Sequence, residues 1–387
     1  MKTRGKVIVA GHICVDITPV FPGNYRIENA GQILQPGRLL HMNGVDVHTG
    51  GAVANTGLAM KILGNDVSLV GKIGEDAFGK IALDMLGKYQ AEKDMIVSAQ
   101  SSTSYSVVLA IPGIDRIFLH DPGANDTFRA EDLNWQMIAQ AELFHFGYPP
   151  LMKNMYQDDG RELVTVLQKV KALGTAVSLD MAAVDPVSEA GKVRWKEILK
   201  AVLPYVDFFV PSAEELCAML DGELYQEWSR KAAGRDVTEI LRMEELHRLG
   251  TEVLEFGAKV VLIKCGSAGM YFRTAQAEQL KELCTSLNLK PEEWASKEGF
   301  EKSFEPEAVL SGTGAGDTSI AAFLTSVMRG ESLEEAVQMA AAIGACCVAA
   351  YDALSGLKPL EQLKEKIRKG WKKNGEAINV WNGWRNG

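Results

Sequence analysis

The sequence has few of the features that mark a secreted, disulfide-rich or metal-binding chain. Its 387 residues include six cysteines, and none forms a CxxC pair or a pair with zinc-ligand spacing. Six are too few for a disulfide framework at this length, so they favour a reducing environment. The first basic residues are followed by a short apolar run, residues 7–10, which cannot form the core of an export signal. We therefore expect a cytoplasmic protein.

Long apolar runs and basic clusters are also lacking. The most apolar late stretch, residues 336–350, contains Gln338 and is shorter than the roughly 20 residues that a membrane-spanning helix needs. The chain has 41 Lys+Arg against 50 Asp+Glu, a net charge of −9, and no window is basic enough to override that acidity. We expect neither a membrane nor a nucleic acid as a partner.

Alternating strand-like and helical patterns occupy most of the chain. The composition, 47% hydrophobic and 24% charged, is that of a folded protein with a large core. Apolar β-branched segments are separated by segments with helical spacing, a pattern that predicts an α/β fold with a doubly wound, mainly parallel sheet. The predicted strands lie at residues 6–11, 67–73, 143–146, 176–180, 206–210 and 259–264.

Two early segments depart from that pattern. Residues 38–49 and 104–119 alternate apolar and polar positions, which is typical of a sheet with one solvated face. We expect a small antiparallel β lid formed from residues of about 17–50 and 103–121. The rest of the chain is expected to form one large domain, residues 1–368, with an insertion at about 274–306. A tail, 369–387, carries Trp371, Trp381 and Trp384, which could pack on the chain's own surface or on a partner subunit.

The most informative motif is Ser311-Gly-Thr-Gly-Ala-Gly-Asp317, which precedes an apolar helix predicted for residues 318–328. Glycines before a helix let backbone N–H groups converge on an anion, and the helix dipole adds to the attraction. The alternative is a glycine-rich turn before a core helix. Asp317 stands where a dinucleotide fingerprint needs its third glycine, so a Rossmann site is disfavoured. Asp317 could cap the helix, or it could accept the proton of an attacking hydroxyl.

Three other positions attract attention. Gly51 and Asn55, in Gly50-Gly51-Ala-Val-Ala-Asn55, would bring backbone and a side-chain amide close to a ligand, or form a turn with an Asn cap. Asp16 follows the first strand and suits a pair of sugar hydroxyls, although it could be a solvated loop acid. The P-loop-like residues 74–81 fail chemically, because Glu75 and Asp76 would repel phosphate.

Taken in order, the motifs resemble those of the ribokinase-like (PfkB) carbohydrate kinases from about Val7 to about Leu360. The matching segments are residues 51–55, Gly71-Lys-Ile-Gly-Glu-Asp-Ala-Phe-Gly79, Gly123-Ala-Asn125, Lys264-Cys-Gly-Ser-Ala-Gly269 and Thr313-Gly-Ala-Gly-Asp317. The resemblance implies a ribokinase-like fold and ATP-dependent phosphorylation of a hydroxyl group on a small sugar or polyol. It also implies Mg²⁺ as a cofactor and a possible homodimer through the lid edge.

The resemblance assigns a role to each matching residue. Asp317 would be the general base, and the backbone amides of Gly314, Ala315 and Gly316 would form the anion hole. The sugar would be bound by Asp16, Gly51 and Asn55. The nucleotide would lie along Lys264, Gly266 and Gly269.

Two departures from the family pattern weaken parts of this assignment. Ser311 replaces an aspartate that helps to hold the sugar and is linked to a monovalent cation, so that cation becomes doubtful. Ser212-Ala-Glu-Glu215 keeps the acid of the family's Asn-x-x-Glu motif and loses its amide. Glu215 is the expected partner of magnesium through water, or else a surface helix acid. A nucleoside kinase of the same fold and a catalytically silent sugar- or nucleotide-binding regulator are the alternative functions.

Overall fold

The computed structural model describes residues 5–23, 35–111 and 117–375, and a sheet of eight strands forms its centre. The strand order is β14-β13-β12-β11-β10-β9-β1-β4. The six strands from β12 to β4 are parallel, and β13 and β14 add an antiparallel edge. The mainly parallel sheet is therefore confirmed. The bounds are β1 Lys6–Gly11, β4 Asp66–Val70, β9 Ala141–Gly147, β10 Ala176–Asp180, β11 Phe208–Phe209, β12 Val260–Cys265, β13 Gly269–Thr274 and β14 Glu298–Lys302.

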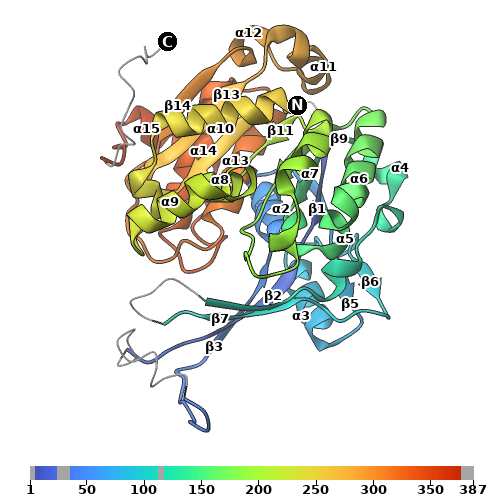
Figure 1. The fold of residues 1–387 in the computed structure, drawn as a ribbon, viewed down its shortest axis with the longest axis vertical. Helices are drawn as coiled ribbons and strands as arrows, with labels where there is room; N and C mark the ends of the chain where they lie inside the picture. The colour runs from blue at the N-terminus through green and yellow to red at the C-terminus, as the bar shows by residue number, and fades with distance from the viewer. Residues whose placement is uncertain (1–4, 24–34, 112–116, 376–387) are drawn as a thin grey trace.

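Helices cover both faces of this sheet, as a doubly wound fold requires (Figure 1). Along β1, Val7 and Val9 enter one hydrophobic core while Ile8 and Ala10 enter the other, because successive strand residues point to opposite faces. The first core takes α2 Ala52–Ile62, α11 Ala277–Leu287, α12 Pro291–Trp294, α13 Ala315–Met328, α14 Leu333–Cys347 and α15 Leu360–Arg368. The second takes α4 Trp135–Ile138, α5 Lys153–Tyr156, α6 Arg161–Ala172, α7 Trp195–Val202, α8 Ala213–Leu220, α9 Gly222–Ala232 and α10 Met243–Glu255. Within the described ranges, no helix is both long and apolar enough to cross a membrane.

A second sheet projects from the main body and forms the lid (Figure 1). Its order is β3-β2-β7-β8, with bounds β2 Cys14–Pro19, β3 Val45–Gly50, β7 Tyr105–Leu109 and β8 Ile117–Asp121. The pairs β2–β3 and β7–β8 are antiparallel, whereas β2–β7 is parallel. The lid is thus mixed rather than wholly antiparallel, because β2 and β7 both run outward and each is followed by a returning strand. Residues 24–34 and 112–116 of the predicted lid lie outside the described residues, and pairing of two copies through its edge stays a prediction.

The predicted insertion, residues 274–306, contributes regular structure to the main body. It contains α11, α12 and β14, and β14 extends the sheet beyond β13. The chain then returns to this region through its tail. The Trp371 ring stacks on Phe304 with ring centroids 4.6 Å apart, and its Nε1 donates to the Glu305 carbonyl over 2.8 Å. Trp371 therefore packs on the chain's own surface, while Trp381 and Trp384 lie outside the described residues.

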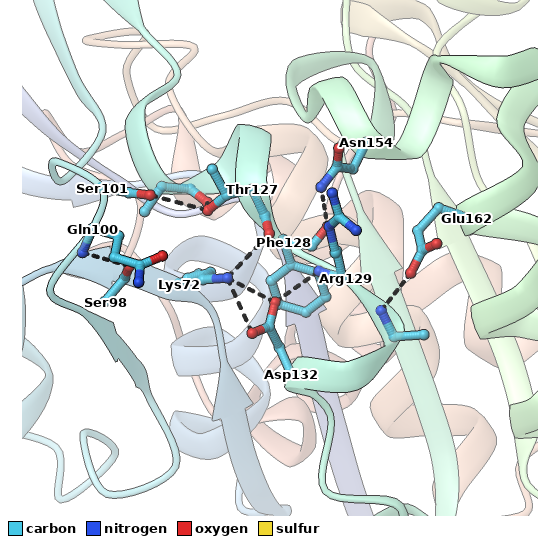
Figure 2. A network of polar contacts seen from close by, with 12 residues as sticks. Lys72, Ser98, Gln100, Ser101, Thr127, Phe128, Arg129, Asp132, Asn154 and Glu162 are labelled. Atoms are coloured by element: carbon cyan, nitrogen blue, oxygen red, sulfur yellow. Dashed lines mark hydrogen bonds and ion pairs between the residues drawn. The ribbon is translucent and has the colours of Figure 1, made fainter.

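A polar network fixes the segment that links the lid to the main sheet (Figure 2). Near it, β5 Lys72–Gly74 pairs with β6 Ile96–Ser98, and α3 Ala77–Gly87 follows β5. Lys72 Nζ lies 2.9 Å from Asp132 Oδ2 and 3.0 Å from the Thr127 carbonyl oxygen (Figure 2). Within the same segment, the buried Asn125 side chain bonds both the N–H (3.1 Å) and the carbonyl (2.9 Å) of Ile13. The predicted Gly123-Ala-Asn125 motif thus anchors the junction between β1 and β2.

Candidate active site

Asp317 lies at the meeting point of three segments that are distant in sequence. Helix α13 begins at Ala315, three residues earlier than predicted, so Asp317 belongs to its first turn. The residue is 4% exposed. Its Oδ2 accepts a hydrogen bond from Asn55 Nδ2 (2.9 Å), and its Oδ1 accepts bonds from the Tyr148 hydroxyl (2.7 Å) and Thr56 Oγ1 (3.3 Å). The glycine-rich motif therefore presents a buried, oriented carboxylate.

Burial raises the pKa of Asp317 above its ordinary value. The hydrogen bonds from Tyr148 and Asn55, and the positive charge of Lys264, act in the opposite direction because they favour the charged form. A carboxylate that is ionised but more basic than usual is well suited to accept a proton near neutral pH. The environment of Asp317 thus fits the role of general base.

Gly314 is required by the space around it, whereas a Cβ at Gly316 would make only ordinary contacts. Gly314 has a φ of 72°, and a Cβ at this position would lie 2.3 Å from the Cβ of Ala353. A Cβ at Gly316 would lie 3.5 Å from the Lys264 Cε. Amides at the start of an α-helix lack intrahelical acceptors and carry the positive end of the helix dipole. The amides of residues 314–316, which we call the anion cradle, are therefore suited to hold an anion, with the Lys264 side chain beside them.

Lys264 belongs to a buried charged cluster at the ends of neighbouring strands. Its Nζ donates to Asp180 Oδ1 over 2.6 Å and to the Val210 carbonyl over 2.7 Å. Burial raises the pKa of Asp180, the positive charge of Lys264 opposes this shift, and the nearby charges of Glu215 and Asp317 add to it. Burial lowers the pKa of Lys264, but Asp180 and Glu215 outweigh it and the net shift is upward. The lysine thus remains a cation beside the anion cradle.

Glu215 and Ser212 form a reciprocal helix cap at the start of α8. The Ser212 N–H donates to Glu215 Oε2 over 2.7 Å, and the Glu215 N–H donates to Ser212 Oγ over 3.2 Å. Ser212 therefore supplies a cap where the family pattern has an amide. Within the described part of the chain, no three His, Cys, Asp or Glu side chains are placed to hold a metal together. Mg²⁺ usually keeps its waters and takes one or two carboxylates with phosphate oxygens, a requirement that Glu215 and Asp180 can meet.

A cavity of about 1220 Å³ separates the lid from the main body. Asp16 lines it from β2, so this residue belongs to the lid sheet rather than to the mouth of the main sheet. Burial raises the pKa of Asp16, and hydrogen bonds from Cys14 and Ser106 oppose the shift. Asn55 lines the opposite part of the wall together with residues 311–313. The cavity therefore brings the predicted sugar ligands Asp16 and Asn55 to the edge of the Asp317 site.

Gly51 allows α2 to begin directly against a buried histidine. It has a φ of 86°, and a Cβ there would lie 2.5 Å from His12 Nδ1. His12 is buried, and neither of its ring nitrogens has a hydrogen-bond partner among the described residues. Burial and the neighbouring His120 lower the pKa of His12 to about 3, so the imidazole is neutral. Asn55 is the fourth residue of α2 and bonds Asp317, so it is not a helix cap.

The other predicted positions have clear structural surroundings. Gly266 and Gly269 border the short turn between β12 and β13, and a Cβ at Gly269 would lie 2.1 Å from the Glu301 carbonyl oxygen. Packing alone therefore requires glycine there, and contact with a nucleotide stays a prediction. Ser311 Oγ donates to Thr313 Oγ1 over 2.9 Å and accepts from the Thr313 N–H over 3.1 Å. Its hydroxyl stabilises the glycine-rich loop.

Sequence reasoning missed three residues of this site: Tyr148, Thr56 and Asp180. Asp180 ends β10, and Tyr148 follows β9 directly. Ligand sites in open α/β sheets lie at the carboxyl ends of the strands, and this rule could have identified both residues. No sequence pattern distinguishes Thr56, apart from its position next to Asn55.

Known proteins resemble this chain over most of its length. The family profile of the pfkB family carbohydrate kinases matches residues 6–359. Fructokinase-2 of Oryza sativa subsp. japonica is 22% identical over 373 residues, 94% of each chain. The 5-dehydro-2-deoxygluconokinase of Clostridium perfringens is 21% identical over 389 residues, 97% of each chain.

Among solved structures, the ribokinase of Arabidopsis thaliana complexed with ribose and ATP superposes with a TM-score of 0.67. Its sequence identity is 19%, and the match covers 93% of this chain and 98% of that one. The predicted ribokinase-like fold is confirmed. The family match extends over most of the chain and also confirms the predicted enzyme class. The chain belongs to the pfkB family of carbohydrate kinases.

Proposed function

We propose that this chain transfers the γ-phosphoryl group of ATP to a hydroxyl group of a small, uncharged sugar or polyol. The observation that carries the proposal is the position of Asp317, which stands directly behind the anion cradle and bonds Asn55 of the cavity wall. A general base is needed where the acceptor hydroxyl meets the transferring group. The solved ribokinase complex with ribose and ATP supports ATP and a sugar as the two substrates.

The hydrogen bonds of Asp317 indicate which oxygen takes the proton. An ionised carboxylate offers about two acceptor sites on each oxygen. Tyr148 and Thr56 occupy both sites of Oδ1, whereas Asn55 occupies one site of Oδ2. Oδ2 is therefore the atom that accepts the hydroxyl proton. The hydroxyl oxygen attacks the γ-phosphorus as the bond to the ADP oxygen breaks.

Charge that develops on the transferring group would be stabilised by the cradle. The amides of Gly314, Ala315 and Gly316 act as fixed donors, and the Lys264 ammonium beside Gly316 adds a full positive charge. Gly266 and Gly269 continue from the same strand end and would lie along the nucleotide. Preorganised donors of this kind need no rearrangement during the reaction.

Magnesium would be held near Glu215 through water, with Asp180 as a second carboxylate in the same cluster. Magnesium bound there would supply neutralisation of the phosphate charge. Glu215 Oε2 is engaged by the Ser212 N–H, and this bond orients the carboxylate.

The charge of the cavity favours an acceptor without a negative group. The relatives include both a fructokinase and a 5-dehydro-2-deoxygluconokinase, so their names leave the acceptor class open. Three of the lining side chains are carboxylates, Asp16, Asp46 and Asp352, and one is a lysine, Lys88. The lining His48 is paired with Asp46 at 2.7 Å. A carboxylate or phosphate on the acceptor would meet repulsion, whereas hydroxyls can donate to these acids.

Replacement of the base tests the proposal. Asp317→Asn should abolish acceptor-dependent ADP release while calorimetry still detects ATP binding. Asp221→Asn is the matched control, because Asp221 is also an acid at a helix N-terminus but caps α9. Near-normal turnover by Asp317→Asn would remove the basis of the proposal.

The acceptor panel must contain neutral sugars, polyols, sugar acids and nucleosides. Preference for nucleosides would favour the nucleoside-kinase alternative. Heat of binding without ADP release from the unsubstituted chain would favour the silent regulator.

A further inference from the structure

Tyr148 adopts a backbone conformation that its sequence context disfavours. Its φ is 66° and ψ is 44°, in the left-handed region that non-glycine residues seldom occupy. The following residue is Pro149, which pushes its predecessor toward an extended conformation. Such strained residues persist where the surrounding structure enforces them, and they concentrate at functional sites. Tyr148 therefore calls for a functional explanation.

Two backbone hydrogen bonds hold the strained turn in place. The Tyr148 N–H donates to the Asp180 carbonyl over 3.2 Å, and the Tyr148 carbonyl accepts from the Leu151 N–H over 3.0 Å. The turn is thus tied to the end of β10 on one side and continues into a short helical segment on the other. Because the turn follows β9 directly, it places the Tyr148 phenol against Asp317 in α13.

The Tyr148 hydroxyl bonds a single oxygen of the proposed general base, Asp317. It donates to Asp317 Oδ1 over 2.7 Å, and Thr56 Oγ1 donates to the same oxygen over 3.3 Å. The Tyr148 ring also lies against His12, with ring centroids 6.0 Å apart. Because Oδ1 has no acceptor site left, the carboxylate can rotate only by losing two hydrogen bonds.

We propose that Tyr148 is a positioning residue, which holds the Asp317 carboxylate in its charged form and turns Oδ2 toward the acceptor hydroxyl. The proposal rests on the function proposed above, in which Asp317 is the general base. None of the motifs that carry the family resemblance includes Tyr148. Its role follows from the bond geometry and from the strained turn that produces it.

The electrostatic surroundings explain why such a donor is needed. Asp317 is buried, which favours its neutral form, and its charged or titratable neighbours are Tyr148, Lys264 from β12, Asp180 from β10 and Cys347 from α14. Of these, Lys264 supplies a positive charge, and Tyr148 supplies a hydrogen bond that strengthens when Asp317 is ionised.

Tyr148 is fitted to remain a donor throughout the reaction. Burial raises its pKa well above the ordinary value, and the neighbouring carboxylates Asp317, Asp180 and Glu215 raise it further. The phenol therefore stays protonated at and above neutral pH. It cannot compete with Asp317 for the proton of the acceptor.

The experiment measures the pH profile of Tyr148→Phe with ATP and the preferred acceptor. Loss of the donor should raise the pKa of Asp317, so the acidic limb of kcat/KM should move to higher pH. Below the wild-type midpoint we expect a loss of about tenfold or more, the value of a hydrogen bond to a charged group. At high pH, where Asp317 is ionised in both proteins, the two rates should converge.

Tyr271→Phe is the matched control. The Tyr271 hydroxyl is also buried and donates to a carboxylate, Glu298 Oε1 at 2.6 Å, but it lies on β13 outside the site. This variant should keep the wild-type pH profile. A wild-type profile in Tyr148→Phe, or an equal loss at every pH, would overturn the proposal.

If Tyr148→Phe fails to fold, Thr56→Val provides the second test. This nearly isosteric change removes the other donor to Oδ1 and should move the acidic limb in the same direction by a smaller amount. An unmoved limb in Thr56→Val would overturn the proposal. Failure of the proposed function is distinguishable from either result, because it would appear as retained turnover in Asp317→Asn.

Discussion

The ion pair between Lys264 and Asp180 is the most deeply buried charge pair of the site. The two atoms, Nζ and Oδ1, are 2.6 Å apart, and the side chains are 13% and 1% exposed. Breaking a buried pair leaves one charge without a partner, whereas replacing both members leaves none. Single and double substitutions of this pair can therefore distinguish an effect on the free energy of unfolding from an effect on phosphoryl transfer.

We expect Lys264→Met to lower the free energy of unfolding by about 3 kcal/mol, since Asp180 would be left buried and unpaired. The double variant Lys264→Met with Asp180→Leu should recover much of that loss. Both variants should lack phosphoryl transfer because the cation beside Gly316 is gone. Urea unfolding and ADP release measure the two properties.

A second buried charge cluster provides the control for catalysis. Asp207 Oδ1 lies 2.7 Å from Lys259 Nζ and Asp207 Oδ2 lies 2.8 Å from Lys171 Nζ, near the start of β12 and away from residues 314–316. Because Lys171 still pairs with Asp207, Lys259→Met should lower stability by less than Lys264→Met, and it should leave turnover per folded molecule unchanged. Full activity in Lys264→Met would contradict the role of that lysine.

Gly314→Ala should disrupt the anion cradle. The new Cβ would lie 2.3 Å from that of Ala353 and would sit on a backbone with a φ of 72°. We expect at least a hundredfold loss of kcat, because small displacements of positioned groups are costly to catalysis. Gly370→Ala is the control, since Gly370 has a φ of 88° but open space around it. Equal effects on activity in the two variants would show that strain alone, and not the cradle, matters.

Acceptors should be discriminated by charge. A neutral hexose should have a kcat/KM about tenfold or more above that of its aldonic acid, which corresponds to about 1.4 kcal/mol of repulsion from the acidic wall. Replacement of Asp46 and Asp352 by asparagine should lower the ratio of kcat/KM for the neutral hexose to that for its aldonic acid. Competition assays with both acceptors test the prediction, and a preference for the acid in the unsubstituted protein would refute it.

Stability should fall in mildly acidic solution because of two buried histidines. Burial lowers the pKa values of His12 and His145 to about 3, while the unfolded chain protonates near 6.5. The unfolded state then binds more protons, so the stability present above pH 6.5 is lost as the pH falls toward 3. From pH 7 to pH 5, each histidine should contribute a decrease of about 2 kcal/mol in the free energy of unfolding.

The histidine prediction is checked by denaturant unfolding at a series of pH values. His145→Asn should remove about 2 kcal/mol of the decrease in stability between pH 7 and pH 5. His41→Asn, at an exposed position of the chain, should leave that dependence unchanged. An identical dependence in the wild type and in His145→Asn would contradict the prediction.

The sequence revealed most of the main body because its periodicity is local. The β-branched run at residues 6–11 coincides with β1, and the pattern at 176–180 coincides with β10. Helix α9, Gly222–Ala232, carries little apolar periodicity, because its composition is largely polar and its buried side chains are Trp228 and Ala232. The parallel pairing of β2 and β7 was missed because pairing depends on chain direction, which no local pattern records.

The sequence predicted those site residues that belong to short, recognisable sequence motifs. Asp317, Asn55 and Lys264 were identified, and the structure brings them together. Tyr148 was not, because its role depends on a hydrogen bond to a residue 169 positions later. Likewise the pairing of Asp180 with Lys264 spans 84 positions. Such relationships come from packing of the whole sheet and leave no trace in nearby residues.

The long separations around Asp317 have a consequence for how the protein is made. The donors to its carboxylate come from positions 262, 261 and 169 residues earlier in the chain. During synthesis the amino-terminal segments emerge first, and distant contacts form late. The reactive carboxylate therefore receives its partners when α13 docks on α2, near the end of folding. A chain that ends before α13 therefore lacks the proposed base.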